Sequence, residues 1–289
     1  MDKKLIKEIT ESSFFDSNDI LKLFNSVTNA DKTVLANGTV LCGDSDNRKS
    51  LIVFRFKPCG VMAEPNNRAV ILSESEKEKE MLTDSILYKD SKPYAVLRKR
   101  DDKFIINTAD KEELNPGEIL EPERKFIINN DRIYLSDVSA IMLYLALKCA
   151  ENGKVSVALV NESLAGEGAL SEAVRVVNPG RAIAVAAAAE TEGFKVGGGT
   201  GIVIKDGCCV VSKRVTECME NSAEGSTQFY IGKTDTGLER LSISAALNGF
   251  CGLYIAATGI ETKICELSAE DVEKTQNFLL KISDTFDII

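Results

Sequence analysis

The 289-residue chain is predicted to be an α/β protein, with three layers (α/β/α), a mixed and mostly parallel sheet, and a small inserted β-rich domain. Two observations predict this fold. Short apolar runs alternate with amphipathic segments after residue 127, as in a sheet covered by helices on both faces. Residues 63–126 instead combine a charge-rich stretch with short β-prone runs. We therefore expect an α/β domain of residues 1–62 and 127–289, interrupted by a β-rich domain of residues 63–126.

The N-terminal part of the α/β domain is expected to begin with helices. Residues 3–29 are predicted to form two of them, and Ser17 or Asn18 is the expected cap of the second. A hairpin is predicted about Asn37-Gly38, where a turn dipeptide separates two β-prone runs. The apolar run SLIVFRF, residues 50–56, is predicted to be the first strongly apolar strand.

The inserted region is expected to contain short strands joined by turns. Its runs YAVLRKR and KFIINT flank Asp101-Asp102, and this arrangement predicts a hairpin. The longest basic stretch of the chain, LRKRDDK at residues 97–103, belongs to the same hairpin. We interpret it as the solvated rim of the hairpin rather than as a phosphate-binding patch.

Strands and helices alternate regularly after residue 127. Ser136 is predicted to cap an amphipathic helix that ends at Gly153. Further strands are expected at residues 154–160, 181–189, 201–206, 208–213, 227–232 and 251–257. Further helices are expected at residues 170–177, 215–223 and 238–249, and from 268 to about 287.

The bulk composition argues against several classes of protein. The net charge is −9, with 35 Lys and Arg against 44 Asp and Glu, so a nucleic-acid partner is not expected. No window has the apolar character of a signal peptide or the length of a membrane span, so no membrane association is expected. The eight cysteines are scattered and do not form a disulfide pattern. We therefore expect a cytoplasmic protein.

Histidine is absent from the sequence, which removes the commonest general base and the commonest zinc ligand. Other chemical motifs are weak. The stretches GEGAL and GGGTG do not match a phosphate-binding loop, and we interpret them as tight turns. Cys208-Cys209 is expected to point to opposite faces of a strand, and no CxxC motif supports a cysteine zinc site. A serine nucleophile would need a lysine or Glu162 as its base, and no SxxK motif supports it.

Seven segments, in order along the chain, together resemble the M42 family of metal-dependent aminopeptidases. VNESLAGEGA is similar to the family's Glu-Glu-Val-Gly-Leu-Arg-Gly-Ala, and GKTDTG is similar to its Gly-Gly-Thr-Asp-Ala. The other five segments are LIVFRFKPCGVM, RIYLSDVSAIMLYL, VNPGRAIAVA, VGGGTGIVIKD and IETKICELSAED. The resemblance implies a zinc-peptidase-like fold, with the insertion where the family has its smaller β domain. It also implies a site where two zinc or cobalt ions share a water that a glutamate deprotonates.

Carried over position by position, the resemblance implies that the metal site is lost. The general-base glutamate is retained as Glu162. The bridging aspartate becomes Ser136, although an acid persists beside it as Asp137. The remaining family ligands, and the aspartate that follows the first ligand histidine, are replaced by Arg55, Lys57, Ser163, Ala186 and Glu261. Because a divalent cation needs several converging anionic or imidazole ligands, we expect no metal cofactor and no ordinary aminopeptidase activity.

The replacements suggest an ion-pair cluster in place of the metals. Arg55 and Lys57 alternate along one strand, so both are expected to point to the same face. If that face is the former metal site, the two cations lie near Glu162, Glu261 and Asp137, since buried charges require partners. In the alternative interpretation, Arg55 and Lys57 reach solvent from an edge strand.

The first functional hypothesis is a pseudoenzyme that acts as a binding or assembly protein. Its remnant pocket is expected to bind a peptide or a small carboxylate through Arg55 and Lys57. A homo-oligomer is also expected, since M42 peptidases assemble. The second hypothesis is a peptide hydrolase with a rearranged site, in which Glu162 is the base and Glu261, Asp137 and Asp235 are ligands. A third is a scaffold whose pocket is filled by the new side chains.

Overall fold

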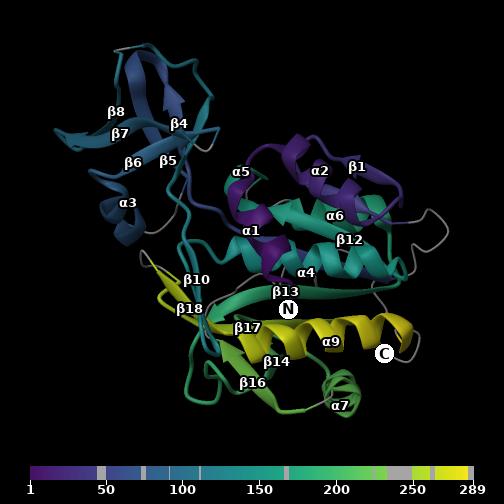
Figure 1. The fold of residues 1–289 in the computed structure, drawn as a ribbon. Coiled ribbons are helices and arrows are strands. Elements are labelled where there is room, and N and C mark those ends of the chain that lie inside the picture. Colours follow the sequence, from purple (N-terminus) through teal and green to yellow (C-terminus); the bar gives the residue numbers. More distant parts are fainter. Residues whose placement is uncertain are drawn as a thin grey trace.

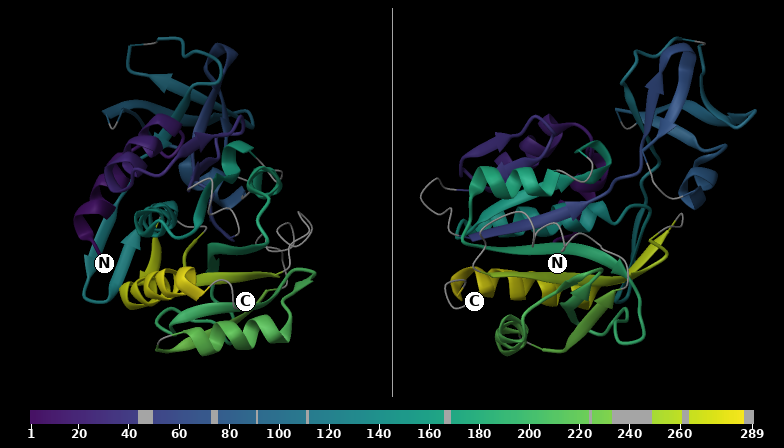
Figure 2. Two further views of the ribbon diagram at one scale, coloured as in Figure 1. Left: turned by 90° about the vertical axis from the view of Figure 1, so that its right-hand side faces the viewer. Right: turned by 180° about the vertical axis from the view of Figure 1, so that it is seen from behind.

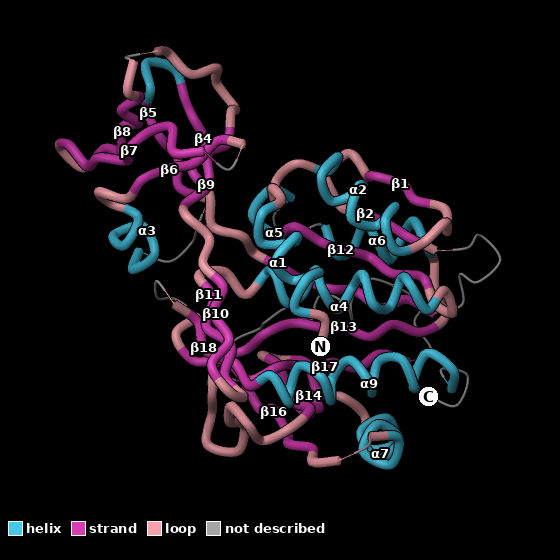
Figure 3. Tube along the Cα trace, in the orientation of Figure 1, coloured by secondary structure: helices cyan, strands magenta, loops and turns pink. Residues whose placement is uncertain are grey.

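The computed structural model describes residues 1–43, 50–72, 76–90, 92–110, 112–165, 169–223, 225–232, 249–260 and 264–285. Within this part of the chain, a large mixed sheet with helices on both faces forms one body, and a closed barrel projects from it (Figure 1). Figure 3 shows loops connecting the barrel to the large sheet. This arrangement confirms the predicted fold class.

The large sheet is parallel at its centre and antiparallel on its flanks. Strands β12, β3, β13 and β17 lie side by side and parallel, whereas β2 and β18 join this group antiparallel. Strands β14 and β16 are parallel to each other beyond β17. The strands are β1 (Lys32–Val34), β2 (Val40–Cys42), β3 (Ser50–Phe56), β10 (Phe126–Asn129), β11 (Arg132–Leu135), β12 (Ser156–Asn161), β13 (Arg181–Ala189), β14 (Thr200–Asp206), β15 (Cys209–Val210), β16 (Thr227–Gly232), β17 (Gly249–Thr258) and β18 (Cys265–Ser268).

Helices cover both faces of this sheet. Figures 1 and 2 show α4 on one face of β3 and β12, and α6 on the other. All residues of β3 and β12 are buried, which explains why both read as continuous apolar runs. The helices outside the barrel are α1 (Lys3–Glu11), α2 (Ser17–Val27), α4 (Ser139–Asn152), α5 (Glu162–Ala165), α6 (Ala169–Val177), α7 (Lys213–Ser222) and α9 (Ala269–Thr285).

Two predicted helix caps are wrong. The side chain of Asp16, not of Ser17 or Asn18, caps α2 by accepting a hydrogen bond from the Asn18 N–H group. Helix α4 begins at Ser139 with no side-chain cap, and Ser136 instead accepts a hydrogen bond from the Lys125 N–H group. Short polar side chains bond to whichever backbone group the tertiary structure brings near, so sequence position alone misassigned both.

The barrel closes in the order β4-β5-β8-β7-β6-β9 around its own apolar core. Its hairpin turn at Asp101-Asp102 has positive φ at both residues and lies where the sequence predicted it. The strands are β4 (Val61–Glu64), β5 (Arg68–Ile71), β6 (Ile86–Lys89), β7 (Lys92–Arg100), β8 (Lys103–Thr108) and β9 (Ile119–Pro122), with helix α3 (Glu76–Leu82) and a 3-10 turn at Pro65–Asn67. The domain boundaries at residues 62 and 127 stay a prediction.

The C-terminal half departs from the prediction in two places. The strand expected at residues 208–213 is only β15, because helix α7 already begins at Lys213. The helix expected at residues 238–249 lies outside the described residues, apart from Gly249, which begins β17. Cys208 is exposed and Cys209 is buried, as expected for neighbours on opposite faces.

The glycine-rich loop before β14 is held by a buried carboxylate. The N–H groups of Gly197 and Gly199 donate to the two oxygens of Asp271, over 2.7 and 2.8 Å. Gly199 has a φ of +99°, and a Cβ atom there would lie 1.9 Å from the carbonyl oxygen of Ser226. This position therefore requires glycine. The loop is a tight, closely packed turn.

Candidate functional site

The candidate site lies where β3 and β12 end. The parallel register places Val160 beside Arg55 and Asn161 beside Phe56, so Glu162 follows directly at the edge of the sheet. Arg55 Nε donates to Glu162 Oε1 over 2.6 Å, and Arg55 Nη2 contacts the same oxygen. The Arg55 side chain is 8% exposed and that of Glu162 is 18% exposed. The two charges therefore form an ion pair that is largely shielded from water.

Lys57 does not share this environment. It lies one residue beyond the end of β3 and is exposed, whereas Arg55 is buried within the strand. The interpretation of an edge strand is wrong for Arg55, because β3 lies between β12 and β13. The expected ion pair is present between Arg55 and Glu162, and the exposed Lys57 lies two residues beyond Arg55 in the sequence.

Ser163 forms two further hydrogen bonds near the ends of the same strands. Its hydroxyl donates to the carbonyl oxygen of Pro58 over 2.7 Å, and its N–H group donates to Asn161 Oδ1 over 3.1 Å. The consecutive residues Glu162 and Ser163 therefore bond to Arg55 and Pro58, which lie three residues apart on the neighbouring chain segment. Pro58 and Cys59 belong to the segment that leads from the large sheet into the barrel.

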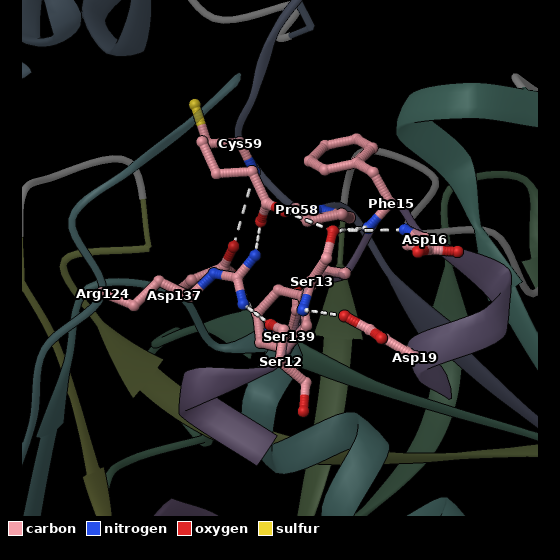
Figure 4. Close-up of polar contacts among 12 residues, drawn as sticks. Ser12, Ser13, Phe15, Asp16, Asp19, Pro58, Cys59, Arg124, Asp137 and Ser139 are labelled. Carbon is pink, nitrogen blue, oxygen red and sulfur yellow. Dashed lines mark hydrogen bonds and ion pairs between the residues drawn. The ribbon is translucent and has the colours of Figure 1, made fainter. Parts of the chain in front are cut away.

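Asp137 accepts a hydrogen bond from the backbone of the same segment, at Cys59. Its carboxylate accepts hydrogen bonds from the N–H groups of Ser139, over 2.8 Å, and Cys59, over 3.4 Å (Figure 4). Burial raises the pKa of Asp137, while the bonds from Ser139, the charge of Arg124 and the Cys59 N–H group act in the opposite direction. Both oxygens are therefore committed to the backbone. The neighbouring Ser136 bonds to Lys125 instead and does not join Asp137 in a site.

Arg124 is a structural residue that the sequence analysis missed. Its guanidinium carbon lies 3.7 Å from the centre of the Phe14 ring, and its Nη atoms contact the Ser12 carbonyl oxygen and the Glu121 carboxylate. Figure 4 shows it beside Asp137. Burial lowers its pKa to about 10, so it remains charged at neutral pH. No feature of the sequence distinguishes it from the exposed Lys125 that follows.

The position that the resemblance gives to a metal-binding aspartate carries a methyl group. Ala186 on β13 lies directly beside Tyr254 on β17, and both are buried. The Tyr254 hydroxyl donates to Asp206 Oδ2 over 2.7 Å, and its ring packs edge-on against Tyr230. Asp206 and Tyr254 are fully buried. The neighbour of Ala186 on β17 is therefore a buried tyrosine whose hydroxyl is bonded to Asp206.

The side chains of the described residues that could bind a metal ion do not form a site for two metal ions. Within the ranges that the structure describes, no group of three or more His, Cys, Asp or Glu side chains could hold a metal ion. Glu162 is paired with a cation, and Asp137 with backbone N–H groups. The two other predicted acids, Asp235 and Glu261, lie outside the described residues.

The fold is that of the M42 aminopeptidases. The chain is similar to an aminopeptidase from the archaeon Desulfurococcus kamchatkensis, with a TM-score of 0.77 and 16% identity, covering 96% of this chain and 94% of that chain. It is also similar to the Pyrococcus horikoshii TET1 peptidase (TM-score 0.76, 13% identity, 96% and 99% covered), which can assemble into a tetrahedron or a large octahedral shell.

A third similar structure is the TET aminopeptidase of a marine-sediment Thaumarchaeota archaeon, with a TM-score of 0.76 and 13% identity, covering 96% of this chain and 94% of that chain. No protein-family model and no curated protein matches the chain by sequence. In the described part of the chain, no helix is long and apolar enough to cross a membrane.

Proposed function

We propose that this protein is a pseudoenzyme with an M42 aminopeptidase fold, which binds or assembles with other molecules instead of hydrolysing peptides. The observation that carries this proposal is the shielded ion pair between Arg55 and Glu162. A guanidinium group has no lone pair to offer a cation, and its fixed positive charge repels one. At the position where the resemblance implies a ligand histidine, it therefore opposes metal binding.

The neighbouring side chains support the same proposal. The Ser163 hydroxyl is used to bind the Pro58 carbonyl oxygen, and Ala186 contributes only a methyl group. Calorimetric titration with zinc, cobalt and manganese tests the metal site. We expect no stoichiometric binding that depends on Glu162 or Glu261. Two metal equivalents per chain, lost when both residues are changed to Gln, would contradict the proposal.

The ligand that we propose for the remnant site is a peptide or small carboxylate. The side chain of Glu162 is 18% exposed and that of Arg55 is 8% exposed, and Arg55 contacts one oxygen of Glu162. Lys57, one residue beyond the end of β3, is exposed and supplies a cation for such a ligand. Titration with a dipeptide, followed by NMR, should show binding in the wild type and weaker binding in Lys57→Glu. Equal binding by both proteins would contradict this assignment.

We also propose that the protein is a cytoplasmic homo-oligomer. The TET1 peptidase with the same fold assembles into large shells, which supports self-association here. The eight free cysteines, most of them buried, support a reducing compartment. Sedimentation velocity tests the first statement, and a single monomeric boundary at micromolar concentration would contradict it.

The alternative function, a hydrolase with a rearranged site, has less support. It would use Glu162 as base with Asp137, Asp235 and Glu261 as ligands. Both oxygens of Asp137 already accept hydrogen bonds from backbone N–H groups, those of Ser139 and Cys59, which a metal ion would have to displace or share. Asp235 and Glu261 lie outside the described residues.

A further inference from the structure

The outer surface of the barrel carries four cationic side chains on three adjacent strands. The register places Arg68 of β5 and Arg98 of β7 on either side of Ile105 of β8. Two residues further along the hairpin, Arg100 stands directly opposite Lys103. Because directly paired residues and residues two apart share a face, all four cations point outward on the same side. We call these four residues the cationic face.

Barrel closure and burial confirm this orientation. The alternate residues of the same strands, including Leu97 and Ile106, are buried in the barrel core. The four cationic residues are exposed. Apolar side chains lie among them, with Val70 36% exposed and Val96 and Ile105 partly exposed. Arginine, which supplies three of the four cations, is enriched at protein interfaces relative to the rest of the surface.

The barrel itself neutralises only part of this charge. Arg98 forms an ion pair with Asp84, and Glu64 stands opposite Arg68 in the next strand. Within the described residues, no carboxylate pairs with Arg68, Arg100 or Lys103. Asp102 in the hairpin turn lies 4.0 Å from Lys99, which is not part of the cationic face.

Like charges placed directly opposite on a hairpin oppose its pairing, so the Arg100 and Lys103 pair does not stabilise the fold. A partner that supplies carboxylates would remove the repulsion. Arginine suits this role, since its planar fork matches a carboxylate.

We propose that the cationic face binds an extended acidic polypeptide segment. Arg98 and Arg100 are two residues apart on one strand, which separates them by about 6.6 Å. Alternate side chains of an extended peptide have the same spacing, so acidic residues at every second position can meet both arginines. The aliphatic side chains between the cations can contact the apolar residues of such a peptide. This surface is independent of the site at Arg55 and Glu162.

Other polyanions fit the surface less well. The outward positions that define the face carry no aromatic side chain on which the bases of a single-stranded nucleic acid could stack. The overall negative charge of the chain also repels an extended nucleic acid or an anionic membrane at long range. A short acidic segment interacts mainly with the local face.

The test uses the full chain and a fluorescent octapeptide of alternating Glu and Val, with binding followed by anisotropy. We expect saturable binding that weakens as salt is added. The variant Arg68→Glu/Arg100→Glu/Lys103→Glu should bind about tenfold or more weakly. A variant of the same net charge, Lys4→Glu/Lys7→Glu/Lys213→Glu, changes exposed helical lysines and should bind within about twofold of the wild type.

Three results would overturn the proposal: an equal loss in both variants, equal binding of an octapeptide of alternating Lys and Val, or tighter binding of oligouridine or of phosphatidylserine vesicles. If the triple Glu variant does not fold, Arg100→Gln/Lys103→Gln replaces it. This milder variant should show a smaller loss in the same direction, and unchanged affinity would also overturn the proposal.

Discussion

Arg55 Nε donates a hydrogen bond to Glu162 Oε1 over 2.6 Å, at the edge where two parallel strands end. One residue further along, Ser163 bonds to Pro58 over 2.7 Å. The first contact connects the residue after β12 to β3, and the second connects Ser163 to the segment that leads from β3 into the barrel. Glu162 is thus one half of a shielded ion pair, and its neighbour Ser163 is part of a structural connection.

Removing one partner of this ion pair should destabilise the protein. Arg55→Leu leaves the Glu162 charge largely shielded from water without its cation, and we expect a loss of about 3 kcal/mol in the free energy of unfolding. The double variant Arg55→Leu/Glu162→Leu should lie within about 1 kcal/mol of the wild type, because it removes both charges. Urea denaturation measures both. A loss in the double variant equal to the sum of the losses in the two single variants would contradict the pairing.

The hydrogen bond of Ser163 should contribute a smaller amount. Ser163→Ala removes the donor to the Pro58 carbonyl oxygen, and we expect the free energy of unfolding to fall by about 1 kcal/mol. Ser163→Thr keeps the hydroxyl group and serves as the control, with a smaller loss expected. The hydrogen bond would be unimportant if the Ala and Thr variants unfolded at the same urea concentration as the wild type.

Arg124 should be sensitive to a change that preserves its charge. Arg124→Lys loses the planar group that stacks on Phe14 and contacts both Ser12 and Glu121, so we expect a loss of about 1–2 kcal/mol. Lys125→Ala is the matched control, because Lys125 is exposed and forms an ion pair with the exposed Glu123. Its effect should stay within about 0.5 kcal/mol. Thermal unfolding that ranks the two variants in the opposite order would contradict the account.

Asp271 should make the stability of the protein depend on pH. Burial raises its pKa above 3.8, against the opposing effect of the Gly197 and Gly199 N–H groups. Between pH 3.8 and the raised value, the folded protein therefore binds more protons than the unfolded chain. The stability that this group contributes is complete below pH 3.8 and is lost as the pH rises through the folded pKa.

Comparison with Asp271→Asn isolates this effect, because the variant lacks the carboxyl group that titrates. The wild type should lose stability relative to the variant as the pH rises from about 4, by about 1.4 kcal/mol for each unit by which the pKa is raised. Urea denaturation at several pH values measures the difference. A difference that stays constant, or that changes in favour of the wild type, would show that burial of Asp271 does not raise its pKa.

The sequence predicted the fold because its signals are local and repeated. Fully buried strands such as β3 and β12 appear as unbroken apolar runs, and α4 ends at Gly153, as predicted, with this glycine in the left-handed conformation. The contact between Arg55 and Glu162 could be predicted from the spacing of the basic residues together with the family resemblance. Each of these features depends on residues close together in the sequence or on a known arrangement of strands.

The remaining contacts of the site depend on loops that meet only in the folded chain. Ser136 matched a helix cap, but the Lys125 N–H group, eleven residues earlier, is its partner. Arg124 acts through Ser12 and Phe14, more than a hundred positions away. Lys57 was expected beside Arg55, but β3 ends before it. No periodic pattern encodes such contacts.

Aminopeptidase turnover tests the central claim most directly. The wild type and Glu162→Gln are assayed on a panel of aminoacyl p-nitroanilides with added zinc, cobalt or manganese. A site built on the Arg55 and Glu162 ion pair predicts no metal-dependent turnover in the wild type above that of the variant. Metal-dependent turnover by the wild type that disappears in Glu162→Gln would contradict the claim and identify Glu162 as a working base.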